Sequence, residues 1–202
     1  MEIKTTDLFA KTFTPSFRKF LENDSTEHYH NGGRGSGKSS FVSIAIVLGI
    51  LQNKDWNALV LRKVKNTLYR SVYGQISWAI NKLGVASSFK FLKSPLQIEY
   101  IPTGQLIIFE GADEPTKIKS LKLNRGYIAM LWFEELEEFK RRDIYDIGIT
   151  TKRGGDVFKT FYTFNAPSSP RHWVNQMYLE PKKGAIKHHS TYLDVSQAWL
   201  GS

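Results

Sequence analysis

The sequence contains no cysteine and no long uninterrupted apolar run. The missing thiols exclude a disulfide framework, a thiolate metal site and a cysteine nucleophile. The longest apolar stretch, residues 41–51, is interrupted by Ser43 and Gly49 and is shorter than the ~20 residues that cross a bilayer. The first ten residues are polar and of mixed charge, unlike a signal peptide. We therefore expect a cytoplasmic protein with no membrane partner.

Acidic residues are also in deficit. The chain has 19 Asp and Glu against 28 Lys and Arg, which gives a formal net charge of +9. The basic surplus lies beyond residue 30, because residues 1–30 carry four basic and five acidic side chains. Such a charge favours a polyanionic partner, nucleic acid above all. With 202 residues, 41% of them hydrophobic, the chain is long enough for one globular domain.

Apolar runs and helical patterns alternate from residue 28 onward. This alternation predicts an α/β domain whose mostly parallel central sheet is flanked by helices. The expected strands cover 28–31, 58–62, 127–133, 157–164 and 185–193, and the expected helices cover 39–51, 66–83 and 171–179.

Two other segments complete the predicted organisation. Residues 89–109 contain three short strand-like runs, separated by Ser94 and Pro95 and by a turn at 102–104, and these predict an antiparallel strand excursion. Residues 1–27 form a lead-in in which phenylalanines recur with helical spacing, and we expect it to pack on the core. The functional domain is then expected to cover residues 28–202.

A glycine-rich segment satisfies the complete phosphate-binding pattern G-x-x-x-x-G-K-[ST]. Its glycines let successive N–H groups point at phosphate oxygens, Lys38 supplies a charge for the β- and γ-phosphates, and the Ser39 hydroxyl is a ligand for Mg²⁺. The alternative is a glycine-rich surface turn that carries a lysine, but a strand precedes this segment and an apolar helix follows it. We therefore predict a P-loop NTPase that binds ATP and Mg²⁺. The predicted nucleotide-binding residues are Gly32, Gly33, Arg34, Gly35, Ser36, Gly37, Lys38, Ser39 and Ser40.

The apolar strand at 127–133 ends in two carboxylates, Glu134 and Glu135. A P-loop ATPase needs a carboxylate on the magnesium side and a base that orients the attacking water. We assign Glu134 to the metal and Glu135 to the base. Successive strand residues point to opposite faces, so the strand must bend for both to reach one site. The alternative is that these residues, with Glu137 and Glu138, form a solvated acidic helix start.

These motifs together resemble the N-terminal ATPase domain of the tailed-phage terminase large subunit, the motor that packages DNA into a procapsid. A glutamate replaces the family's usual aspartate at position 134. The order and spacing match over most of residues 28–193. The segments that carry the resemblance are 32–39, 61–63 with 68–73, 111–113 with 117–120, 132–135, and 163–167 with 172–173.

The resemblance implies roles for three more residues, which join Lys38 and Glu135 as predicted catalytic residues. Asn165 would sense the γ-phosphate and couple hydrolysis to movement, although an Asn before Ala-Pro is also a common turn former. Arg34 would stabilise the phosphates from within the loop, unless it is a solvent-facing loop residue. Arg125 would be the arginine finger that enters a neighbouring subunit's site, with a surface or DNA-backbone arginine as the alternative.

As a member of this ASCE-type P-loop class, the chain is expected to be a Mg²⁺-dependent ATPase that drives double-stranded DNA into a procapsid in the host cytoplasm. The implied partners are the portal protein, the small terminase subunit and further copies in a ring, while the lone domain is expected to be monomeric. The family's nuclease domain is expected to be absent, because only Asp156, Glu180 and Asp194 are acidic beyond residue 150. Alternative functions are another P-loop ATPase, or a nucleotide-gated DNA-binding or assembly module with little hydrolysis. Candidate DNA contacts, or simply a solvated basic face, are residues 140–142 and 152–153.

Overall fold

The computed structural model describes Phe17 and residues 23–195. The described part contains one eight-stranded sheet with the order β3-β4-β5-β2-β6-β7-β1-β8. All pairs among β5, β2, β6, β7, β1 and β8 are parallel, and the β3-β4 and β4-β5 pairs are antiparallel. The predicted α/β fold and its antiparallel excursion are therefore confirmed. The strands are β1 (Glu27–Gly32), β2 (Trp56–Arg62), β3 (Phe89–Lys93), β4 (Leu96–Tyr100), β5 (Gln105–Gly111), β6 (Tyr127–Glu134), β7 (Lys159–Phe164) and β8 (Ala185–Ser190).

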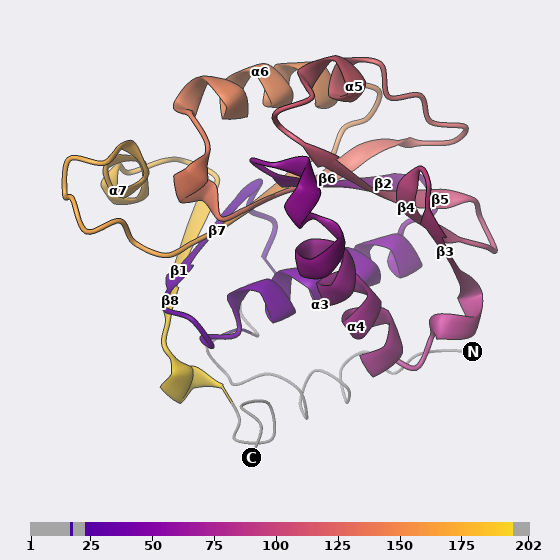
Figure 1. Cartoon of the computed structure of the whole chain (residues 1–202), viewed down its shortest axis with the longest axis horizontal. Coiled ribbons are helices and arrows are strands. Elements are labelled where there is room, and N and C mark those ends of the chain that lie inside the picture. The colour runs from indigo at the N-terminus through magenta and orange to yellow at the C-terminus, as the bar shows by residue number, and fades with distance from the viewer. Residues whose placement is uncertain (1–16, 18–22, 196–202) are drawn as a thin grey trace.

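Helices cover both faces of the sheet (Figure 1). On one face lie α3 (Lys38–Gln52) and α4 (Gly74–Lys82). On the other lie α5 (Pro115–Lys119), α6 (Arg141–Thr151) and α7 (Trp173–Leu179). Short 3₁₀ turns occupy Lys65–Thr67, Ala86–Ser88, Leu136–Glu138 and Tyr192–Asp194, and a π-helical turn occupies Tyr69–Tyr73.

The central strands are buried on both faces, as crossovers through helices require. Alternate side chains of β6 enter different cores: Trp132 packs on the α3 side, while Leu131 and Phe133 pack on the α6 side. The same alternation in β2 sends Val60 to the α3 side and Leu61 to the α6 side. Each central strand therefore joins the two layers.

The predicted single helix at 66–83 is wrong in detail, because the structure divides it into a 3₁₀ turn, a π-helical turn and α4. The wide turn is closed by the Tyr73 N–H, which donates to the Leu68 carbonyl at 3.0 Å. Leu68, Val72, Ile76 and Ile80 recur every four residues, whereas an α-helix turns every 3.6. One wide turn absorbs this drift, so that all four side chains stay buried.

Part of the predicted lead-in can be checked. Phe17 is buried, and its ring packs 5.2 Å from the ring of Phe41 and 4.4 Å from that of His188. The other phenylalanines of that pattern, Phe9, Phe13 and Phe20, lie outside the described residues. None of the described helices has the length and apolar character needed to cross a membrane.

Candidate nucleotide-binding site

All of the predicted site residues except Arg125 meet where three parallel strands end. The register places Asn31 of β1 beside Phe164 of β7, and Glu134 of β6 beside Thr163 of β7. The loop after β1 therefore faces the ends of β6 and β7 across a cavity of about 330 Å³. The cavity is lined by Gly33, Arg34, Gly35, Ser36, Gly37, Lys38, Ser39, Ser40, Gln75, Glu134, Glu135, Thr163, Phe164 and Asn165.

The loop adopts a conformation that needs its glycines. Gly35 and Gly37 have φ values of 72° and 76°, in the left-handed region that a side chain disfavours. A Cβ on Gly32 would overlap the carbonyl oxygen of Ser190. The loop leads directly into α3, whose first turn holds no acidic residue. The positive end of this helix is therefore open to an anion in the cavity.

Lys38 is folded back into its own loop. Its ammonium donates to the carbonyl oxygens of Gly32 at 2.6 Å and Gly33 at 2.7 Å, and to Ser36 Oγ at 3.1 Å. It also donates to Asn165 Oδ1 at 3.2 Å, which joins the loop to the end of β7. The side chain is buried, and none of the described carboxylates forms a direct ion pair with it. An anion that enters the cavity would supply the missing counter-charge.

Burial lowers the pKa of Lys38 to about 8, against the opposing attraction of Glu137 and Glu134. Burial also raises the pKa of Glu134, although Arg62 and the Ser39 hydroxyl act in the opposite direction. Both shifts express the cost of holding a charge away from water without full compensation. A phosphate with its magnesium ion would relieve both.

Ser39 and Glu134 supply the oxygen atoms that Mg²⁺ prefers. The Ser39 hydroxyl donates to Glu134 Oε1 at 3.4 Å, so the two groups lie side by side in the lining of the cavity. Mg²⁺ is commonly held by one or two such ligands together with phosphate oxygens. Within residue 17 and residues 23–195, no group of three or more His, Asp or Glu is arranged to hold a metal without such help. The residues present therefore fit a nucleotide-bound magnesium ion.

The strand bends at Glu135, as the placement of both carboxylates in one site requires. Glu135 has φ 56° and ψ 57° and is the single non-glycine residue in the described ranges with a positive φ. This left-handed conformation breaks the strand's alternation, so that Glu134 and Glu135 both line the cavity. A glutamate held in such a sparsely populated conformation is typical of functional sites.

Arg62, which the sequence did not single out as a site residue, lies beneath these carboxylates. It ends β2 and is almost fully buried. Its Nε lies 3.3 Å from Glu134 Oε2, its Nη2 contacts Glu135 Oε2, and Nη2 lies 3.6 Å from Glu138 Oε2. One guanidinium therefore orients both the predicted metal ligand, Glu134, and the predicted base, Glu135. The available signal was a charged residue at the end of an otherwise apolar strand.

Two further polar residues join the site without having been predicted. Glu137 Oε1 accepts a hydrogen bond from the Asn165 N–H at 3.2 Å, and burial raises the pKa of Glu137. This bond ties the turn after β6 to the end of β7. Gln75 of α4 lines the cavity, and its Nε2 donates to Ser40 Oγ at 3.2 Å.

The two predicted arginines lie in different places. Arg34 is exposed at the cavity and forms no ion pair within the described part of the chain. Arg125 precedes β6, and the seven strand steps from Tyr127 to Glu134 alone span about 23 Å at ~3.3 Å per residue. Its Nε lies 3.3 Å from Asp55 Oδ1, and its carbonyl accepts from Asn57 Nδ2 at 2.8 Å. The structure thus does not bring Arg125 to its own chain's cavity.

Comparison with known proteins agrees with this geometry. A family model described as phage terminase large subunit matches residues 24–202. The chain is 33% identical over 211 residues to the terminase large subunit of Bacillus phage SPP1, covering 98% of this chain and 49% of that protein. It is 34% identical over 134 residues to the PBSX phage terminase large subunit of Bacillus subtilis (strain 168), covering 66% of this chain and 30% of that protein.

Among solved structures, the large terminase of a thermophilic bacteriophage in complex with ATP-gamma-S has a similar fold. Its TM-score is 0.70 at 18% identity, and the match covers 91% of this chain and 46% of the thermophilic phage chain. This chain therefore spans half or less of the length of each relative.

Proposed function

Because the chain belongs to the phage terminase large subunit family, we propose that it is the ATPase domain of a viral DNA-packaging motor. In this proposal it hydrolyses ATP with Mg²⁺ to drive double-stranded DNA into a procapsid. The observation that carries the proposal is the meeting of the phosphate loop, Lys38, Ser39, two carboxylates and Asn165 at one cavity. The large terminase of the thermophilic phage, whose fold is similar, was solved with ATP-gamma-S.

The residues divide the chemistry between them. The loop N–H groups and the start of α3 bind phosphate oxygens, and Lys38 exchanges its carbonyl partners for the β- and γ-phosphates. Ser39 and Glu134 hold Mg²⁺, which when bound neutralises charge on the phosphates. Glu135 orients the attacking water and accepts its proton. Asn165 accepts a hydrogen bond from Lys38 and donates one to Glu137. When the Lys38 ammonium moves to the phosphates, Asn165 therefore transmits this change to the end of β7.

The wider setting of this proposal follows from the family. The motor would act as a homo-oligomeric ring on the procapsid in the host cytoplasm, together with the portal protein and the small terminase subunit. Arg125 would then act as a finger in the neighbouring subunit's site, which suits its distance from its own cavity. The isolated domain would be largely monomeric and a slow ATPase.

A complementation experiment tests this arrangement. We expect the specific ATPase activity of the wild-type chain to rise with protein concentration, because neighbours supply the finger. Arg125→Ala should remove that rise while ATP affinity stays nearly unchanged. Arg125→Ala lacks the neighbour-dependent activity and Lys38→Ala lacks ATP binding, so mixing the two should restore part of the lost turnover in a phosphate-release assay.

The matched control is Arg153→Ala, an exposed arginine that forms no ion pair within the described residues. It should behave as wild type in the same assay. A specific activity that is flat across concentration, together with no rescue in the mixture, would place the finger either in cis, with Arg34 as the next candidate, or elsewhere in the chain.

We also propose that this chain has no nuclease activity of its own. A two-metal nuclease needs clustered carboxylates, and residues 151–202 carry three acidic residues spread over the segment. Purified protein should leave supercoiled plasmid intact in Mg²⁺ or Mn²⁺ over hours. Nicking that disappears in a folded point mutant of this chain would contradict the proposal.

A further inference from the structure

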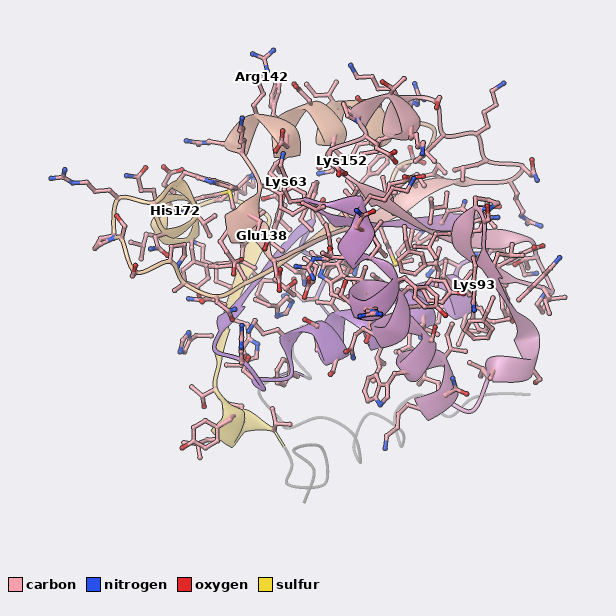
Figure 2. All side chains as sticks on the ribbon, in the orientation of Figure 1. Lys63, Lys93, Glu138, Arg142, Lys152 and His172 are labelled. Carbon is pink, nitrogen blue, oxygen red and sulfur yellow. The ribbon has the colours of Figure 1, made fainter. Side chains whose placement is uncertain are left out.

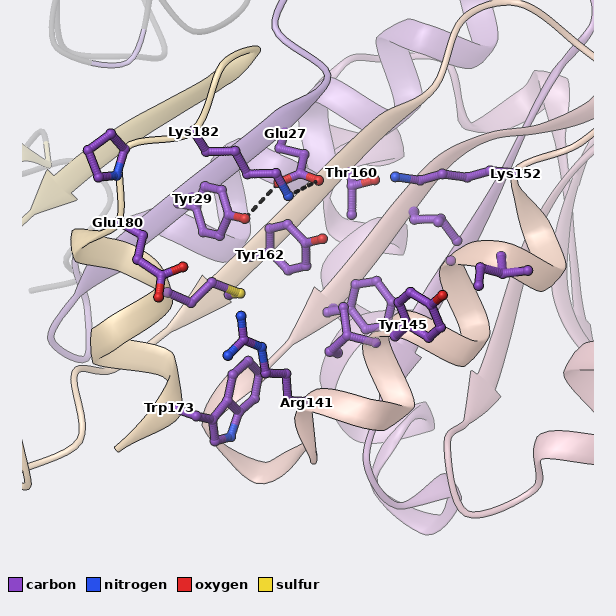
Figure 3. A pocket seen from close by; sticks show the side chains of 17 residues that line it. Glu27, Tyr29, Arg141, Tyr145, Lys152, Thr160, Tyr162, Trp173, Glu180 and Lys182 are labelled. Atoms are coloured by element: carbon purple, nitrogen blue, oxygen red, sulfur yellow. Dashed lines mark hydrogen bonds and ion pairs between the residues drawn. The ribbon is translucent and has the colours of Figure 1, made fainter. Parts of the chain in front are cut away.

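A second and larger cavity lies on the sheet face away from α3. It has a volume of about 670 Å³ and shares no lining residue with the nucleotide cavity. Its floor is formed by β1, β6 and β7, and α6 and α7 form its sides (Figure 3). We call it the α6–α7 groove. It is lined by Glu27, Tyr29, Leu131, Phe133, Arg141, Ile144, Tyr145, Gly148, Ile149, Lys152, Thr160, Tyr162, Trp173, Met177, Glu180, Pro181 and Lys182.

One side of α6 faces this groove without covering it. Arg141, Tyr145, Ile149 and Lys152 recur every three or four residues, which places them on one face of the helix. The two apolar members are largely in solvent, with Tyr145 68% and Ile149 63% exposed. A helix face with apolar residues in the middle and a cation at each end is therefore left without a partner among the described residues.

Both cations of this face lack a direct ion-pair partner. The side chains of Arg141 and Lys152 form no ion pair or hydrogen bond with another described residue, and the one non-helical bond of Lys152 is from its backbone N–H to the Gly148 carbonyl. Lys152 is partly buried, and burial lowers its pKa against the attraction of Glu27. The carboxylate of Glu27, which also lines the groove, is already held by Lys182 at 2.7 Å and by the Tyr29 hydroxyl at 2.6 Å (Figure 3). An occupant must therefore bring its own negative charge.

The floor of the groove offers a polar contact as well. Thr160 is 1% exposed, and its Oγ1 has no hydrogen-bond partner within the described residues. Beside it, the rings of Tyr29 and Tyr162 stack with centroids 4.7 Å apart. A buried hydroxyl without a partner is costly. A hydrogen-bonding group of the occupant would satisfy it.

We propose that the α6–α7 groove docks an extended acidic segment of a partner protein. Lys152 follows Arg141 by eleven positions, so the two charges lie about 16 Å apart along the helix at 1.5 Å per residue. An extended chain covers that distance in about five residues. The segment therefore has carboxylates about five residues apart and apolar side chains between them, which cover Tyr145 and Ile149. This role is additional to nucleotide hydrolysis.

The lining charges favour such a peptide over DNA. The Glu180 carboxylate lies at the α7 side of the groove and has no ion-pair partner in the described part of the chain. It would repel a phosphate backbone, whereas a peptide needs only two carboxylates, placed at the two cations. The sugar-phosphate backbone of DNA is uniformly charged, and the apolar middle of the groove offers it no favourable contact.

The test uses the 202-residue chain and a fluorescein-labelled peptide, acetyl-Glu-Leu-Phe-Leu-Ala-Glu. We expect saturable binding by fluorescence anisotropy and amide shift changes in α6, α7 and β7 by NMR. Arg141→Gln with Lys152→Gln should weaken binding on the order of tenfold, because two charge-assisted contacts are lost. Tyr145→Ala with Ile149→Ala should weaken it comparably, which a purely electrostatic attraction would not explain.

The matched control is Arg142→Gln with Arg153→Gln, which removes the same charge one residue further along. Arg142 projects from the outer side of α6 and is 87% exposed (Figure 2). This pair should change affinity less than twofold, and a peptide with lysine at both ends should not bind. ATP affinity should be unchanged in all these variants, which verifies folding and keeps this test separate from that of the ATPase proposal.

Three results would overturn the inference. The first is absence of peptide binding, or equal loss in the test and control pairs. The second is competition by a DNA duplex whose own affinity falls in the Arg141 and Lys152 variant. The third is self-association of the chain by sedimentation that the same variant abolishes, since the groove would then be filled by a second copy.

Discussion

Lys38→Ala is expected to weaken ATP binding on the order of a hundredfold. The ammonium is the charge most deeply buried in the cavity, and charge-assisted contacts to phosphate are among the strongest in proteins. Isothermal titration calorimetry with ATP and Mg²⁺ measures the loss. Lys38→Met keeps the alkyl chain and should lose as much affinity, which separates lost charge from lost packing.

The same lysine predicts a pH dependence. The pKa of free Lys38 is about 8, and a bound phosphate raises it, because the anion favours the charged ammonium. The affinity for ATP should therefore be highest below pH 8, where the Lys38 ammonium is charged. It should fall as the pH rises above 8, by at most tenfold per pH unit. Lys82→Ala, at the exposed end of α4, serves as a control and should bind ATP as wild type does. Unchanged affinity in Lys38→Ala would remove the basis of the proposed function.

Glu135→Gln is expected to keep nucleotide binding and lose hydrolysis by a factor of about 100 to 10,000. The amide fills the same space, but it cannot accept a proton from the attacking water. Phosphate release under single-turnover conditions measures the chemical step, and calorimetry measures binding in the same sample.

Glu138→Gln is the matched control. Its carboxylate also approaches Arg62, at 3.6 Å, but does not line the cavity. It should retain most of the wild-type turnover. Loss of turnover in Glu134→Gln but not in Glu135→Gln would exchange the roles assigned to the two carboxylates. A wild-type chain that binds ATP yet shows no turnover at any concentration would favour a nucleotide-gated binding module.

Much of the fold can be predicted from local patterns, because each buried strand and the phosphate loop has a recognisable pattern of consecutive residues. All five strands expected outside residues 89–109 are present, with ends that differ by a few residues. The helices α5 and α6 were not predicted. In α6 the large apolar residues Tyr145 and Ile149 point to the groove and not to the core, so its pattern does not mark a buried helix.

The residues of the candidate site also divide into those that the sequence predicts and those that only the structure shows. The loop and the paired carboxylates follow from motifs, and the resemblance to the family indicated Asn165. Arg62 and Gln75 depend on contacts between distant segments, since Arg62 meets Glu135 because β2 lies beside β6 in the sheet. Glu137 belonged to the alternative of a solvated acidic helix start, and its bond to the Asn165 N–H becomes evident once β7 is placed. The order of the strands supplies the neighbours of Arg62 and Glu137, and the packing of α4 on α3 supplies that of Gln75.

The three strands that end at the nucleotide cavity also form the floor of the α6–α7 groove. Tyr29, Phe133 and Tyr162 face the groove and precede Gly32, Glu134 and Asn165 by three, one and three residues. If a groove ligand changes the affinity for ATP, thermodynamic linkage requires ATP to change the affinity for that ligand by the same factor. Binding of a partner in the α6–α7 groove would then change the affinity for ATP, and binding of ATP would change the affinity for the partner. The two sites would be coupled through the one sheet that separates them.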